Sequence, residues 1–201
     1  MNVVALFLKV PMLGKVKTRL AEALGDEGAL MAYTGLVEFL INRLEGSCIH
    51  IHYTGENLES LKQWLGDGFD YIVQEGPGLG ERLNHAMEYE FDWGADKLIF
   101  LGGDCPFLEQ LRVEEAFAVL DNHDVVIGPA ADGGYYLIGI SQKRPEVFAG
   151  VDWGTESVFQ RTLEICEEKG FSFSLLPEES DVDDFEGWKK AKEFMDAGSS
   201  S

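Results

Sequence analysis

A loop near the start of the chain carries the first residues whose types suggest a chemical role. Its cations are Lys9, Lys15, Lys17 and Arg19. They make up a quarter of the 16 basic residues in a chain with 36 acidic ones, and no acidic residue precedes Glu22. The loop is expected to lead from a buried strand into a short helix beginning near Thr18, whose free N–H groups also favour an anion. The pattern predicts a phosphate site, with a solvated basic loop paired to acidic neighbours as the alternative.

Two familiar phosphate motifs are absent from the sequence. A Walker loop requires glycine where Lys9 stands and serine or threonine where Val16 stands. In GPGLGE, Glu81 occupies the position of the third glycine of a dinucleotide fingerprint. Adenylate binding by those routes is therefore not supported. Arg82, in the first turn of the helix expected after GPGLGE, could reach a phosphate or simply face solvent.

Carboxylates follow two later apolar segments, at points where glycines free the backbone. In LIFLGGDCPFL, two glycines precede Asp104 and allow a tight turn close to a ligand at the sheet edge. Capping of the next helix is the alternative role for Asp104. In GPAADGGYYLIG, Asp132 is followed by Gly133 and Gly134, which would let a sugar or base lie against bare backbone. A hairpin turn explains that segment equally well.

Asp181, Asp183 and Asp184 crowd into four residues near the end of the chain. They repel one another unless a cation intervenes or a helix starting at Phe185 takes up part of the charge, so capping is again the alternative. A diphosphate attracted to the basic loop would be repelled by Asp104 and Asp183 at the same edge. Bound Mg²⁺ or Mn²⁺ removes this conflict, because it takes both carboxylate and phosphate oxygens as ligands. Together the loops predict a metal and nucleotide site.

Other residues of reactive types are predicted to be structural. His50 and His52 lie on one face of an expected strand, but the sequence places no third metal ligand beside them. Cys105 has no histidine placed to activate it, and is expected to be a small buried hydrophobe.

Strands and helices must alternate along the chain to position these loops. Apolar runs predict strands at 3–8, 48–53, 71–73, 97–101, 125–127, 135–140 and 171–176. Helical stripes fall between them, and the longest begins at Asp26 and stops before Gly46. The alternation predicts an open, mostly parallel α/β sheet, in which ligands bind outside the carboxyl ends of the strands. We expect one domain over 1–197 and a mobile tail at 198–201.

The composition limits the classes of partner that the protein is expected to bind. A formal charge of −20 makes nucleic acid and anionic membranes improbable partners. The apolar run from Val3 to Leu8 is far shorter than the ~18 residues that a membrane span needs, and no cation precedes it as in a signal peptide. Three widely spaced cysteines without a Cys-x-x-Cys pair fit a reducing compartment. A cytoplasmic protein is expected.

Six motifs, taken in order, resemble a bacterial family of proposed glycosyltransferases that carries the DUF2064 domain and belongs with the nucleotide-diphospho-sugar transferases. They are KVPMLGKVKTRL, GPGLGERL, LGGDCP, GPAADGGYYLIG, the Trp-Gly-Thr at 153–155 and DVDD. The resemblance covers about 3–188. It implies a three-layer, Rossmann-like mixed sheet of the GT-A kind, with helices on both faces, a nucleotide at the first loop and an aspartate-bound divalent metal.

The resemblance also implies roles for single residues. Lys15, Lys17 and Arg19 would contact phosphates, Asp104 would bind the metal with Asp183 or Asp181, and Asp132, Gly133 and Gly134 would border the sugar or acceptor. Leu13, Gly103 and Gly154 depart from the family, which often has proline, serine and serine there. These departures leave the charged positions intact and bear only on the shape of the pocket.

The expected function is metal-dependent transfer of a sugar from a nucleotide diphosphate to an unknown acceptor hydroxyl. Asp104 and Asp132 are the expected catalytic residues, with Asp132 as the base. One alternative is a nucleotidyltransferase that joins a nucleoside triphosphate to a phosphorylated acceptor and releases pyrophosphate, as in guanylyltransferases of coenzyme F420 assembly. Another is a nucleotide-binding regulator without turnover. Because the chain is short, a homodimer contact or a partner protein could complete the acceptor side.

Overall fold

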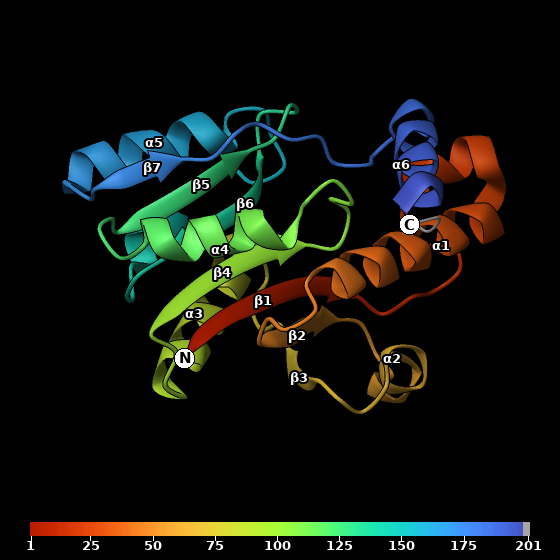
Figure 1. The fold of residues 1–201 in the computed structure, drawn as a ribbon, viewed down its shortest axis with the longest axis horizontal. Coiled ribbons are helices and arrows are strands. Elements are labelled where there is room, and N and C mark those ends of the chain that lie inside the picture. Colours follow the sequence, from red (N-terminus) through yellow and green to blue (C-terminus); the bar gives the residue numbers. More distant parts are fainter. Residues whose placement is uncertain (199–201) are drawn as a thin grey trace.

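The computed structural model describes residues 1–198, and within them seven strands form one mixed sheet (Figure 1). The strands are β1 (Asn2–Lys9), β2 (Ile49–Thr54), β3 (Asp70–Val73), β4 (Lys97–Gly102), β5 (Val125–Pro129), β6 (Tyr135–Ile140) and β7 (Phe173–Leu175). Their order across the sheet is β3-β2-β1-β4-β6-β5-β7. Strand β6 runs antiparallel to β4 and β5, whereas the other paired strands are parallel. The predicted mostly parallel α/β sheet is confirmed.

Helices cover both faces of the sheet, as the three-layer prediction requires. They are α1 (Thr18–Arg43), α2 (Leu58–Leu65), α3 (Leu79–Asp92), α4 (Gln110–Val119), the short 3-10 helix η1 (Pro145–Phe148), α5 (Val158–Lys169) and α6 (Phe185–Gly198). One core cluster packs α1, α2 and α4 against the sheet, and a second packs α3, η1 and α5 against its other face. Strand β1 feeds both clusters, because Val4 and Leu6 face the first while Val3 and Ala5 face the second.

Helix α1 contains a break that the sequence predicts. Gly25 adopts a left-handed φ of 72°, so a short helix from Thr18 is followed by the long amphipathic helix after it. Helix α6 lies beside α1 (Figure 1), where Trp188 packs in a cluster with Leu20, before the break, and Ala191 packs in a cluster with Leu36, after it. This packing brings the segment before α6 close to the start of α1.

Two further features bear on the sequence predictions. None of the described helices combines the length and hydropathy needed to cross a lipid bilayer. Of the tail predicted at 198–201, Gly198 is the last residue of α6, and 199–201 lie outside the described residues.

Candidate functional site

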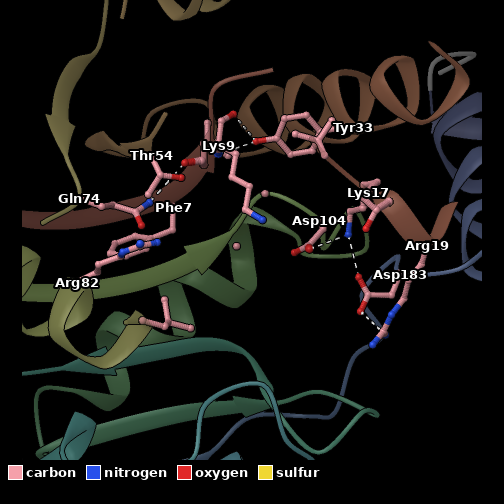
Figure 2. A pocket seen from close by; sticks show the side chains of 16 residues that line it. Phe7, Lys9, Lys17, Arg19, Tyr33, Thr54, Gln74, Arg82, Asp104 and Asp183 are labelled. Carbon is pink, nitrogen blue, oxygen red and sulfur yellow. Dashed lines mark hydrogen bonds and ion pairs between the residues drawn. The ribbon is translucent and has the colours of Figure 1, made fainter. Parts of the chain in front are cut away.

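A cavity of about 470 Å³ lies at the carboxyl ends of β1, β2 and β4 (Figure 2), where an open α/β sheet is expected to bind ligands. Strands contribute Phe7, Leu8, Lys9, Thr54 and Gly102 to its walls, the loops after β3 and β4 contribute Gln74, Gly103 and Asp104, and the α1 start contributes Val16, Lys17, Thr18 and Arg19. Tyr33 from α1, Leu79 and Arg82 from α3, and Asp183 complete the lining. The predicted convergence of the basic loop and the acidic loops is therefore observed.

Lys17 is the central cation of the cavity. Its Nζ donates to Asp104 Oδ2 at 2.9 Å and to Asp183 Oδ1 at 3.1 Å (Figure 2). The Lys17 side chain is only 8% exposed. Burial lowers the pKa of this ammonium group, but the two carboxylates outweigh burial and raise the pKa above its ordinary value of 10.5. Lys17 is therefore charged in the folded protein at neutral pH.

The backbone of Lys17 is in the left-handed region, with φ 46° and ψ 48°, at the residue that precedes the first turn of α1. A residue with a side chain adopts this conformation only when its surroundings enforce it. At this position it accompanies a side chain directed to the sheet edge and held by Asp104 and Asp183.

The other predicted cations take different positions. Arg19 is 80% exposed, with Nη1 3.8 Å from Asp183 Oδ2. Lys9 lines the cavity, and its backbone N–H and C=O both bond to the hydroxyl of Tyr33, which fixes the end of β1. Arg82 lines the cavity and donates from Nε to the Gly76 carbonyl at 2.9 Å. Lys15 is exposed and is not part of the cavity lining.

Asp104, Asp181 and Asp183 form the acidic side of the site. One oxygen from each lies within 4.8 Å of the others. Burial first, and then the charges of Asp183 and Asp104, raise the pKa of Asp181 to about 6. Carboxylate oxygens this close, only partly compensated by Lys17, are donors that suit a hard divalent cation. The residues present therefore fit Mg²⁺ or Mn²⁺.

The loops that carry these carboxylates are tied together. The backbone N–H of Val182, a fully buried residue, donates to the carbonyl of Asp104 at 3.1 Å. A Cβ added to Gly103 would lie 2.5 Å from Leu8 Cδ2, so this glycine lets the loop pack on the core as well as border the cavity. Asp184 is the helix cap: its Oδ1 accepts from the Gly187 N–H at 2.7 Å. The capping alternative thus applies to Asp184, while Asp183 faces Lys17.

A second cavity of about 580 Å³ shares Arg19 and Asp183 with the first. Asp132 lines it and is exposed, and its Oδ1 accepts from the Gly134 N–H at 2.9 Å, which closes a turn. Neither Gly133 nor Gly134 lines either of these two cavities. Gly133 has φ 87°, and a Cβ there would lie 2.3 Å from the Glu156 carbonyl oxygen. The hairpin-turn alternative therefore accounts for Gly133, whereas Asp132 remains a candidate base.

The residues that the sequence did not single out include Tyr33 and Gln74. Tyr33 belongs to the apolar stripe of α1, so its pattern is that of a core residue. Gln74 donates from Nε2 to the carbonyls of His52 at 2.8 Å and Leu8 at 3.4 Å. No sequence signal marks this contact, since it joins the loop after β3 to β1 and β2, which lie 66 and 22 positions away along the chain.

His50 and His52 share a partner that sequence spacing does not reveal. Glu90 from α3 accepts from His52 Nε2 at 2.6 Å and from His50 Nδ1 at 2.8 Å. His52 and Glu90 are 0% and 1% exposed. The predicted structural role of both histidines fits this buried bridge, which lies on the α3 face of the sheet, below Phe7 of the cavity.

The mixed sheet with this cavity at its carboxyl edge has the fold of the nucleotide-diphospho-sugar transferases and of nucleotidyltransferases. The chain belongs to a bacterial family described as "Uncharacterized protein conserved in bacteria (DUF2064)", whose sequence profile matches residues 41–155, more than half of its length.

The chain is also similar to individual proteins of known structure or activity. The crystal structure of a proposed nucleotide-diphospho-sugar transferase from Desulfovibrio desulfuricans G20 matches with a TM-score of 0.86 and 38% identity, over 92% of this chain and 84% of that one. The 2-phospho-L-lactate guanylyltransferase of Methanocaldococcus sp. (strain FS406-22) is 26% identical over 137 residues, 68% of this chain. The chain spans only 58% of that relative's length. Rv0371c of Mycobacterium tuberculosis H37Rv, solved as a complex with manganese, shares the fold at a TM-score of 0.57 and 14% identity, over 96% of this chain and 99% of that one.

Proposed function

We propose that the protein is a metal-dependent glycosyltransferase that moves a sugar from a nucleotide diphosphate to an acceptor hydroxyl. The observation that carries the proposal is the buried contact of Lys17 with Asp104 and Asp183 at the cavity rim. Cation and carboxylates at one rim suit a diphosphate accompanied by a divalent ion. The Desulfovibrio desulfuricans protein, which is 38% identical, is a proposed nucleotide-diphospho-sugar transferase, and this likeness supports the same class of substrate.

The cations of the cavity would bind and orient the diphosphate. Lys17, Arg19 and Lys9 supply positive charge at the ends of β1 and the start of α1, and Arg82 faces them from α3. Mg²⁺ or Mn²⁺, held by Asp104 with Asp183 or Asp181, would neutralise charge on the departing diphosphate. Because Lys17 is largely buried, its charge is weakly screened and acts strongly on a phosphate in the cavity.

Asp132 would act as the base from the adjoining cavity. One of its oxygens is engaged by the Gly134 N–H, which orients the carboxylate. The acceptor oxygen forms a bond to the anomeric carbon while the bond from that carbon to the phosphate oxygen breaks, and the electron pair stays on the diphosphate. The acceptor proton passes to the free oxygen of Asp132.

The charge of the second cavity favours a hydroxyl acceptor over a phosphorylated one. Its carboxylates are Asp132, Glu179, Asp181, Asp183, Asp184 and Glu186, and its cations are Arg19 and Lys190. A phosphorylated acceptor would be repelled by this excess of negative charge. A neutral polyol or sugar would meet many hydrogen-bond acceptors there.

A second candidate function is nucleotidyl transfer, in which a nucleoside triphosphate is joined to the acceptor and pyrophosphate leaves. It is favoured by the 26% identity to a guanylyltransferase. The same loop cations and the same carboxylates would serve this reaction, so the products distinguish the two candidates.

The test combines ligand-induced stabilisation with product analysis. The protein is screened against nucleoside di- and triphosphates and nucleotide sugars, with and without Mn²⁺. A ligand at about 100 times its Kd should add about 2.7 kcal/mol to the free energy of unfolding. Release of a nucleoside diphosphate from a nucleotide sugar supports glycosyl transfer, and release of pyrophosphate supports the second candidate.

Asp104→Asn should abolish the metal-dependent stabilisation. Asp67→Asn, at an exposed aspartate outside the cavity, is the matched control and should leave it intact. Stabilisation by a nucleotide without any turnover would instead indicate a regulator. No stabilisation by any nucleotide would refute the proposal.

A further inference from the structure

Lys17 contacts two carboxylates of the cluster that could hold a divalent cation. Its Nζ bonds to Asp104 Oδ2 and Asp183 Oδ1, two of the three carboxylates close enough to share an ion. Among the described residues, Lys17 is the one whose ammonium donates to both. Arg19 is mostly exposed and approaches only Asp183, and Lys15 is exposed and has no ion pair with these carboxylates.

We propose that Lys17 is a stand-in cation, which holds Asp104 and Asp183 in the nucleotide-free protein and is exchanged for the metal when nucleotide binds. The inference rests on the proposed function, because it concerns how that site loads its metal. Lys17 would leave the carboxylates and pair with the phosphates, while the metal takes the oxygens that Lys17 releases.

Simultaneous occupancy is unfavourable for electrostatic reasons. A divalent ion binds carboxylate oxygens at about 2.0–2.6 Å. The oxygens at 2.9 and 3.1 Å from Lys17 would then place the ion next to the ammonium group, in a site where Lys17 is only 8% exposed. Two neighbouring cations with little solvent between them repel strongly. An ion that takes these same two oxygens therefore requires Lys17 to move.

The geometry also indicates where the Lys17 ammonium group would move and why. Lys17 lines the nucleotide cavity, so phosphates entering it offer the ammonium group new partners. The left-handed backbone at Lys17 is unfavourable for a residue with a side chain, so its relaxation would favour release of the two carboxylate contacts. Metal and nucleotide should consequently strengthen each other's binding, and each by the same factor.

The experiment measures Mn²⁺ affinity in four forms of the intact protein by calorimetry or electron paramagnetic resonance. These are the wild type, Lys17→Met, Lys17→Arg and Lys15→Met. Without nucleotide, Lys17→Met should bind Mn²⁺ about tenfold more tightly than wild type or tighter, because the competing charge is gone. Lys17→Arg keeps the charge, and Lys15→Met removes an exposed lysine of the same loop, so both should resemble wild type. With a nucleoside diphosphate present, the gain in Mn²⁺ affinity should be larger for wild type than for Lys17→Met.

Equal Mn²⁺ affinity of wild type and Lys17→Met without nucleotide would overturn the exchange but leave the proposed function standing. Absence of Mn²⁺ binding in every form, even with nucleotide, would refute both. If Lys17→Met does not fold, the exchange is tested by NMR of wild-type protein with ¹⁵N-labelled lysines. The Lys17 Nζ signal is expected to shift when Mg²⁺ and a nucleoside diphosphate bind together, and a signal that stays fixed during binding would rule the exchange out.

Discussion

Replacement of Glu90 by glutamine tests the buried bridge beneath the cavity. Glu90 is 1% exposed and accepts from both His50 and His52. A carboxamide is uncharged and has one acceptor oxygen, so His50 loses its 2.8 Å bond to Oε2, and the bonds of both histidines to the remaining oxygen are no longer charge-assisted. Hydrogen bonds to charged groups contribute about 1.5–3 kcal/mol each, and weaker neutral bonds to the remaining oxygen are retained, so we expect a loss of about 2–3 kcal/mol. For a domain of this size the loss corresponds to a fall in Tm of roughly 5–10 °C.

The effect should depend on pH in a defined direction. The bond to Glu90 raises the pKa of His50 above 6.5, so the stability from charged His50 is complete below 6.5 and is lost as pH rises through the higher folded pKa. Burial raises the pKa of Glu90, but the bonds from both histidines outweigh burial and lower the pKa below 4.5. The stability from the Glu90 carboxylate is therefore complete above 4.5 and is lost as pH falls through the lower folded pKa. The difference between wild type and variant should be largest between pH 4.5 and 6.5.

Urea and thermal denaturation followed by circular dichroism at several pH values measure this difference. Glu88→Gln is the matched control, since Glu88 is an exposed residue of the same helix that pairs with Lys143. It should cost no more than about 1 kcal/mol. If the two variants lose the same stability, or if the loss for Glu90→Gln does not vary with pH, the reasoning about the bridge is wrong.

Three further changes have expected outcomes. The Arg144 guanidinium holds the pKa of Asp124 at about 2, so Asp124→Asn should lose stability at neutral pH and approach wild type as pH falls toward 2, in acid denaturation curves. Gly133→Ala should destabilise by more than about 2 kcal/mol because strain and a backbone clash combine, whereas Gly150→Ala, at φ 69° with open space around it, should cost about 1 kcal/mol in urea titrations. Asp132→Ala should lower kcat by roughly 10²–10⁴ and change nucleotide affinity little, and an unchanged kcat would remove it as the base.

The sequence predicts the class of fold because each element carries a local signal. Strand β1 is continuously apolar and feeds core clusters on both faces of the sheet, and α1 has a long apolar stripe interrupted at Gly25. The position of β6 has no such signal. Its insertion between β4 and β5 depends on pairing with residues far along the chain, such as Leu137 with Leu101, and not on its own composition.

The charged part of the site is predictable for a related reason. Parallel strands end at one edge, so the loops that carry Lys17, Asp104 and Asp183 converge once the alternation is recognised. Side-chain direction is not predictable in this way, and Lys15 is exposed although it is only two residues from Lys17. The role of Glu90 is not predictable from the sequence either. Its histidine partners lie about 40 residues away and contact it only because α3 packs against the sheet.

The contact between Lys17 and Asp183 joins residues that are 166 positions apart. A nascent chain emerging from the ribosome therefore carries its basic loop and Asp104 long before the second carboxylate exists. Helix α6, which packs against α1, must also be translated before Asp183 is held in place. The contact of Lys17 with both carboxylates therefore forms only in chains that have been translated past Asp183.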